Sequence, residues 1–97
     1  MTKRLELEKL NLETSKIPWK DLQRFFAGGN VIYVSNELDM IEAAYQISMD
    51  NKDLVQQWMR ENKIAKVTDD QAGKWFEADA EVWAVVVKPW ILVQYEY

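Results

Sequence analysis

The most apolar stretch of the chain is its C-terminal part, residues 82–97 (VWAVVVKPWILVQYEY). Residues 84–87 and 91–93 are apolar at every position, which is typical of β-strands that are buried on both faces. Such strands need a covering layer on each side. We therefore expect two strands here, at the centre of a sheet, with the rest of the chain packed over them.

The step between these two strands is Lys88-Pro89. The 16 residues of the run would span about 50 Å if extended, whereas a domain of this size has a diameter of about 30 Å, so they do not form one straight buried strand. A two-residue hairpin is disfavoured, because its first turn position needs a positive φ, which a residue before proline resists. Three alternatives remain: a wider loop centred on Pro89, a kinked strand, or a strand whose far half pairs with a second copy of the chain. If the alternation continues through this step, the odd-numbered residues from Trp83 to Tyr97 share one face.

Upstream of this run, the sequence predicts about five helices. Residues 3–16 are rich in Leu, Glu and Lys, which favour a helix, although their leucines also alternate in part as in a strand. The other four helices are predicted at residues 18–27, after a cap at Ser35 or Asn36, at residues 52–61, and after a capping box formed by Thr68 and Gln71.

Apolar residues at helical spacing predict which side of each helix is buried. The buried stripes are expected at Trp19, Leu22, Phe25 and Phe26; at Leu38, Ile41, Tyr45 and Met49; at Leu54, Val55, Trp58 and Met59; and at Ala72, Trp75 and Phe76. Asn62 is expected to end the fourth helix in a left-handed conformation. Gly73, inside the last helix, suggests close backbone packing, because glycine there costs about 1 kcal/mol relative to alanine.

Two further segments predict strands. Residues 30–35 (NVIYVS) follow a glycine turn and read as a short buried strand, and residues 63–67 as a weak strand or an extended connector. The expected fold is therefore a single α+β (mixed α/β) domain over residues 1–97, with about five helices on a sheet of three to four strands.

Composition and charge exclude several classes of protein. The chain is 48% hydrophobic, which argues against disorder, and no apolar run approaches the roughly 18 residues of a membrane span. The N-terminal residues lack the apolar core of a secretion signal, so we expect a soluble cytoplasmic protein with no membrane partner. The net charge is −4, with 12 basic and 16 acidic residues in no basic or acidic block, which argues against a nucleic-acid partner.

The residue types present restrict the possible chemistry. The chain has no His and no Cys, which excludes Ser-His-Asp and Cys-His nucleophiles and the usual zinc sites. Glu77, Asp79 and Glu81 form the best carboxylate cluster, and three such oxygen ligands could hold Mg²⁺ or Ca²⁺. Because charged runs are usually solvent-exposed, we interpret them as a hydrated helix end and expect no catalytic residues, no metal and no cofactor.

Five tryptophans in 97 residues are the most unusual feature of the composition. Trp58 and Trp75 lie on predicted core faces of helices. Trp83 and Trp90 flank Lys88-Pro89, where an aromatic patch could be exposed to a partner.

We therefore expect a non-enzymatic domain that self-associates or binds another protein. The expected contact residues are Trp83, Lys88, Trp90, Tyr95 and Tyr97. The alternative is a small-molecule- or metal-binding protein, or a carboxylate-based enzyme, with an aromatic-lined pocket near Trp75 and residues 77–81.

Three stretches together resemble a known protein family. They are KLNLETSKIPWKDLQRFFAGG, VIYVS and WAVVVKPWILVQ, and the resemblance spans roughly residues 10–94. The family consists of short bacterial proteins that form a domain of unknown function. The resemblance implies one compact domain, and it implies no activity, substrate or catalytic residue.

Overall fold

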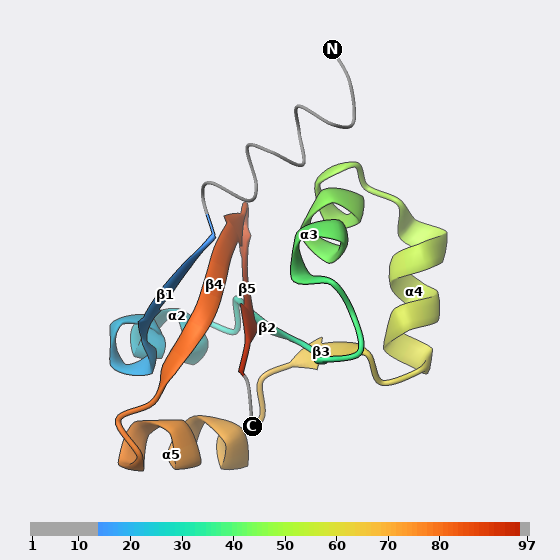
Figure 1. The fold of residues 1–97 in the computed structure, drawn as a ribbon. Helices are drawn as coiled ribbons and strands as arrows, with labels where there is room; N and C mark the ends of the chain where they lie inside the picture. Colours follow the sequence, from blue (N-terminus) through green and yellow to red (C-terminus); the bar gives the residue numbers. More distant parts are fainter. Residues whose placement is uncertain (1–13, 96–97) are drawn as a thin grey trace.

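The computed structural model describes residues 14–95 of the chain. These residues form one five-stranded sheet with helices on both faces (Figure 1). The strands are β1 (Ser15–Pro18), β2 (Val31–Val34), β3 (Ile64–Lys66), β4 (Glu81–Val87) and β5 (Trp90–Gln94). The helices are the 3₁₀ turn η1 (Trp19–Leu22), α2 (Gln23–Ala27), α3 (Met40–Ser48), α4 (Lys52–Arg60) and α5 (Asp69–Glu77).

The strand order in the sheet is β1-β4-β5-β2-β3. The pair β5 and β2 is parallel, and the other three pairs are antiparallel. The C-terminal strands thus lie inside the sheet, with β5 at its centre, as the sequence predicts. The α+β class is confirmed.

The element count differs from the expectation of about five helices on three to four strands. Within residues 14–95 there are four α-helices and five strands. The additional strand is β1, where residues 15 and 16 were expected to end a helix. Ile17 precedes a proline and is therefore biased toward an extended backbone, and Ile17 pairs with Val82 of β4. Residues 3–13 of that expected helix lie outside the described part of the chain.

Each face of the sheet has its own apolar cluster, as the two-sided pattern of the C-terminal run predicts. Helices η1, α2 and α5 cover one face, and α3 and α4 cover the other (Figure 1). Neighbouring residues of β4 alternate between the two: Ala84 belongs to the first cluster and Val85 to the second. The expected core tryptophans Trp19, Trp58 and Trp75 are buried.

The connection between β4 and β5 corrects the sequence analysis. It is a two-residue hairpin: Val87 pairs with Trp90, and the Lys88-Pro89 peptide is cis. A turn with a cis proline at its third position does not need the positive φ that made a short hairpin look unfavourable. The wider loop, the kink and the pairing of β5 with a second copy are therefore wrong, because β5 pairs with β4 and β2 of the same chain.

The two-residue turn also changes which residues share a face. Directly opposed residues point to the same side of a sheet, so Val87 and Trp90 both lie on the α3/α4 side. In β4 the odd-numbered residues lie on this face, whereas in β5 the even-numbered residues lie on it. A straight alternation through residue 88, which would place all odd-numbered residues of the run on one face, therefore does not hold.

Helix α3 begins later than the sequence suggests. Its cap is Asp39, whose Oδ1 accepts hydrogen bonds from the backbone N–H groups of Ile41 and Glu42 at 2.8 and 3.2 Å. Neither expected cap, Ser35 or Asn36, holds this position, and Ser35 instead accepts a hydrogen bond from the Glu37 N–H within the preceding turn. The buried residues of α3 are consequently Met40, Ala43 and Ala44, and Met49 is 58% exposed.

Two other local predictions are confirmed, and one is wrong. Thr68 and Gln71 form the predicted capping box, and Asn62 has φ 59° after α4. At Gly73, however, a Cβ would meet no atom within 4 Å, so close packing does not explain this glycine.

Replacing Gly73 by alanine should therefore stabilise the protein. We expect Gly73→Ala to raise the free energy of unfolding by about 1 kcal/mol, because the helix interior favours alanine and the site has room for the methyl group. Gly29→Ala is the matched control: Gly29 has equally open surroundings but φ +78°, so the same change should cost about 1 kcal/mol or more. Urea unfolding of the three proteins measures both effects, and a destabilised Gly73→Ala would contradict the open packing at this position.

Candidate functional site

Two neighbouring hollows lie on the α3/α4 side of the molecule, beside the β4–β5 hairpin. Their volumes are about 500 Å³ and about 180 Å³, and they share Ile47, Val55 and Trp90 as lining residues. We call the two hollows together the Trp90 groove. The larger hollow is also lined by Ser48, Asp50, Asn51, Lys52, Gln56, Val87, Lys88 and Pro89, and the smaller one by Ile32, Met59, Ile64, Ala65 and Lys66.

The sheet and α4 place the apolar walls of this groove. Trp90 opens β5 and is half-buried on the α3/α4 side, packed against the apolar cluster there. Ile32 of β2 lies on the same face, opposite Lys66 of β3. Val55 and Met59 are four residues apart on α4 and therefore lie on one side of that helix. The smaller hollow is thus lined by α4, by Ile47 of α3 and by residues of β2, β3 and β5.

The smaller hollow is almost entirely apolar. Lys66 is the one charged residue among those that line it. An apolar cavity of about 150 Å³ is large enough to hold benzene. A hollow of about 180 Å³ can therefore accept one large apolar side chain or a small ring.

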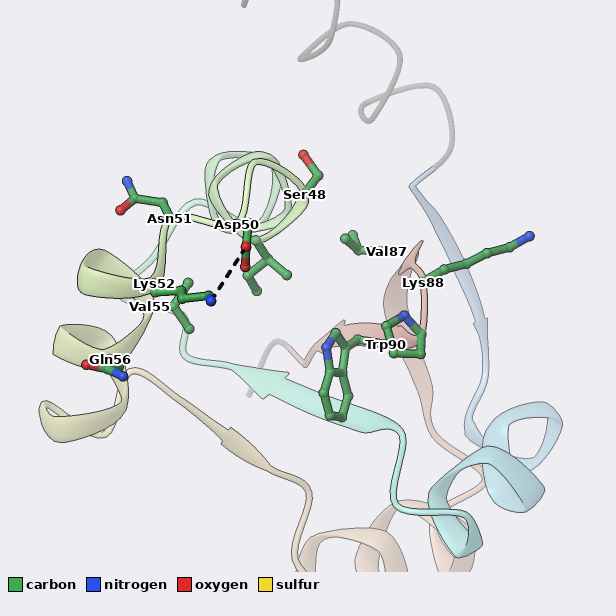
Figure 2. Close-up of a pocket in the computed structure, with 11 residues that line it drawn as sticks. Ser48, Asp50, Asn51, Lys52, Val55, Gln56, Val87, Lys88 and Trp90 are labelled. Carbon is green, nitrogen blue, oxygen red and sulfur yellow. Dashed lines mark ion pairs between the residues drawn. The ribbon is translucent and has the colours of Figure 1, made fainter.

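The larger hollow has a polar wall at the turn between α3 and α4. Figure 2 shows residues of this turn and of α4 across the hollow from Val87 and Trp90, with the Lys88 side chain extended away. Lys52 Nζ lies 4.0 Å from Asp50 Oδ2, and both side chains are more than three-quarters exposed. Asn51 has a structural role, because its Oδ1 caps α4 and its side-chain amide donates to Gln46 Oε1 at 2.9 Å.

The expected contact residues fall into two places. Lys88 and Trp90 both line the larger hollow. Trp83 lies on the same face of the sheet but near the other end of β4, where it pairs with Gln94. Its ring is 5.9 Å from Lys16 Nζ, and Trp83 lines a separate hollow of about 440 Å³ together with Tyr95. Tyr97 lies outside the described residues.

Several groove residues were missed because their role depends on the topology. Val55 and Met59 were expected on the buried face of α4, yet Met59 is 55% exposed. Ile32 lies in β2 and Lys66 in β3. The sequences of these two short strands do not indicate that the strands pair with each other or that they lie beside α4. Helical spacing was the one available signal, and it identifies the apolar face of α4 without showing that this face is incompletely covered.

The three carboxylates considered from the sequence lie on different elements and are not gathered into one group. Glu77 ends α5, Asp79 has φ 53° in the following turn, and Glu81 begins β4. Asp79 pairs with Lys20 at 3.4 Å. In the described part of the chain, no three acidic residues come together in a way that could hold a metal ion.

One carboxyl group near the end of α4 has a clearly shifted pKa. The hydrogen bond from the Gln57 side-chain amide to Glu61 Oε2, at 3.2 Å, holds the pKa of Glu61 below its ordinary value. Lys63, whose Nζ is 3.3 Å from Glu61 Oε1, lowers this pKa further. These contacts fix the end of α4 and lie outside the lining of the groove.

A family model described as "Protein of unknown function (DUF2288)" matches residues 6–95. This chain belongs to that family. The match confirms the resemblance found in the sequence and, by its description, assigns no activity.

A solved structure supports the same conclusion. The NMR solution structure of PA1075 from Pseudomonas aeruginosa is 37% identical in sequence and superimposes with a TM-score of 0.83. The comparison covers 100% of this chain and 89% of the other. No match was found among curated proteins. No helix in residues 14–95 has the length and apolar character needed to cross a membrane.

The Glu61 contacts predict a specific pH effect. A pKa that is lower in the folded state stabilises the fold above the carboxyl's unfolded pKa, and this contribution is lost as the pH falls through the folded pKa. We expect Gln57→Ala to raise the pKa of Glu61 toward its ordinary value, as measured by NMR titration of the carboxyl carbon. Gln56→Ala is the control, because it removes a neighbouring glutamine and leaves both Glu61 contacts in place. Equal effects of the two variants would show that the hydrogen bond is not the main cause.

Proposed function

We propose that this chain is a non-enzymatic binding domain that holds an apolar side chain of another protein in the Trp90 groove. The observation that carries this proposal is the open, almost wholly apolar hollow of about 180 Å³ between α4 and the sheet. It combines a half-buried tryptophan with an exposed methionine, Met59.

The physical properties of these two side chains support protein binding. Tryptophan is enriched among the residues that dominate binding energy, because its ring offers a large rigid surface. Methionine is flexible and fits partners of different shape. Burying the remaining apolar area of the groove would contribute roughly 25 cal/mol per Å².

The groove also lacks several of the usual groups of an acid–base or nucleophilic active site, and its Ser48 hydroxyl donates a hydrogen bond to the Tyr45 carbonyl oxygen at 2.7 Å. Its one carboxylate is Asp50, which is exposed and lies beside Lys52. The groove residues include no Tyr, and the chain has no His or Cys. These features favour binding over catalysis at this place.

A second candidate is a small apolar molecule in the same hollow, which the hollow's volume favours. The aromatic pocket near Trp75, considered from the sequence, has less support. Trp75 is 3% exposed and packs in the core against Trp19, Tyr33 and Tyr95, with ring centroids 5.1 to 6.0 Å apart.

Site-specific photo-crosslinking in the native host cell tests the proposal. A benzophenone amino acid at position 59 should link the chain to another protein, because Met59 lines the groove. The matched control is position 49, since Met49 is equally exposed at 58% but does not line the groove. Adding Trp90→Ala should remove the product formed from position 59.

The Trp90→Ala variant should itself remain folded. Trp90 is half-buried, so its loss should cost less than that of buried Trp58, for which about 3–5 kcal/mol is expected in urea unfolding. A photo-crosslinked product that joins two copies of the chain would identify self-association instead of binding to another protein. Equal products from positions 49 and 59, or none, would contradict the proposal.

A further inference from the structure

We infer that the segment bound in the Trp90 groove is acidic, with Asp or Glu residues next to its apolar anchor side chain. This inference rests on the proposed function and concerns the chemistry of the partner. It follows from the distribution of charge around the groove.

The charge of the groove is opposite to that of the whole chain. Three lysines and one aspartate line its two hollows. The chain has 12 basic and 16 acidic residues and a net charge of −4. A positively charged groove on a negatively charged protein attracts partners selectively. Opposite charge on the partner speeds association, and segments that carry the same charge as the groove are repelled.

Lys66 is the most informative of these charges. It lines the apolar hollow itself, opposite Ile32 on the neighbouring strand. Within residues 14–95, no carboxylate forms an ion pair with its ammonium group. A carboxylate beside an anchor in this hollow would therefore find a cation that no carboxylate of residues 14–95 already pairs with.

Lys52 supplies a second positive charge at the other hollow. Among the described residues it pairs with Asp50, at 4.0 Å between two exposed side chains, an arrangement that contributes little energy. A carboxylate from a partner can replace or share this contact at small cost. Lys88 adds charge at the rim, although its side chain extends away from the hollow (Figure 2).

These positions define the expected arrangement of the partner. The anchor enters the hollow lined by Met59 and Trp90, with Lys66 on the β3 side and Lys52 at the start of α4. A segment with acidic residues on both sides of a large apolar residue complements this pattern. A segment with lysine or arginine at the same places would be repelled by Lys66 and Lys52.

Selection from a displayed library of random 12-residue peptides, with the full chain as the target, tests the inference. We expect enriched peptides that share one large apolar residue flanked by Asp or Glu. Their binding should be lost with Trp90→Ala and should weaken as salt is raised. In calorimetry, Lys66→Glu should weaken the selected peptides about threefold to tenfold.

The matched control is Lys74→Glu, which makes the same charge change on α5, on the other face of the sheet. It should change affinity by less than about twofold, because distant exposed charges are screened. Equal effects of the two variants, or enriched peptides without acidic residues, would overturn the inference and leave the groove as a binding site. If no enriched peptide depends on Trp90, the proposed function fails as well.

Two other occupants would also overturn the inference. Light scattering would reveal a dimer that the selected peptides dissociate, if a second copy fills the groove. Octanoate, a carboxylate on an apolar chain, would displace the peptides and bind more tightly than they do if the groove serves small molecules.

Discussion

The fold depends on the burial of β5 from both sides. Leu92 and Val93 are adjacent in sequence, point to opposite faces of the sheet, and are both 0% exposed. Neither can be covered by the layer that covers the other, so helices are required on both sides of the same strand. The division of the helices into two groups follows from this requirement.

The groove arises where one of these layers is incomplete. Helix α3 contacts β4 and β5, whereas α4 contacts β3. Between them, Trp90 and Ile32 are packed against the apolar cluster on one side and remain half-exposed on the other. The proposed binding surface is therefore an extension of the core, and in that proposal the same side chains would serve both stability and recognition.

The parts of this fold that depend on local chemistry could be predicted from the sequence. The capping box at Thr68, the left-handed Asn62 and the two-sided C-terminal strands are set by neighbouring residues, and the structure contains all three. The start of α3 was harder, because Ser35 and Asp39 are both good caps and the choice between them depends on packing.

The candidate site depends on contacts between distant segments. Trp90 and Lys88 were identified from their unusual position beside a proline. Their neighbours on α4 and β3 are more than 20 residues away in sequence and become neighbours through the sheet order. The parity change at the two-residue turn could not be inferred either, because the conformation of the Lys88-Pro89 peptide is not encoded by residue spacing.

The outer strands of the sheet also limit how partners can attach. An unpaired strand edge is a template for pairing with other chains, and short or proline-containing edge strands reduce this risk. In the described part of the chain, the outer strands β1 and β3 have four and three residues, and β1 ends in Pro18, which has no backbone N–H to donate. Backbone pairing along these edges would offer few hydrogen bonds and little sequence discrimination. Under the proposed function, side chains in the Trp90 groove would select among partners, and the strand edges would not be needed for recognition.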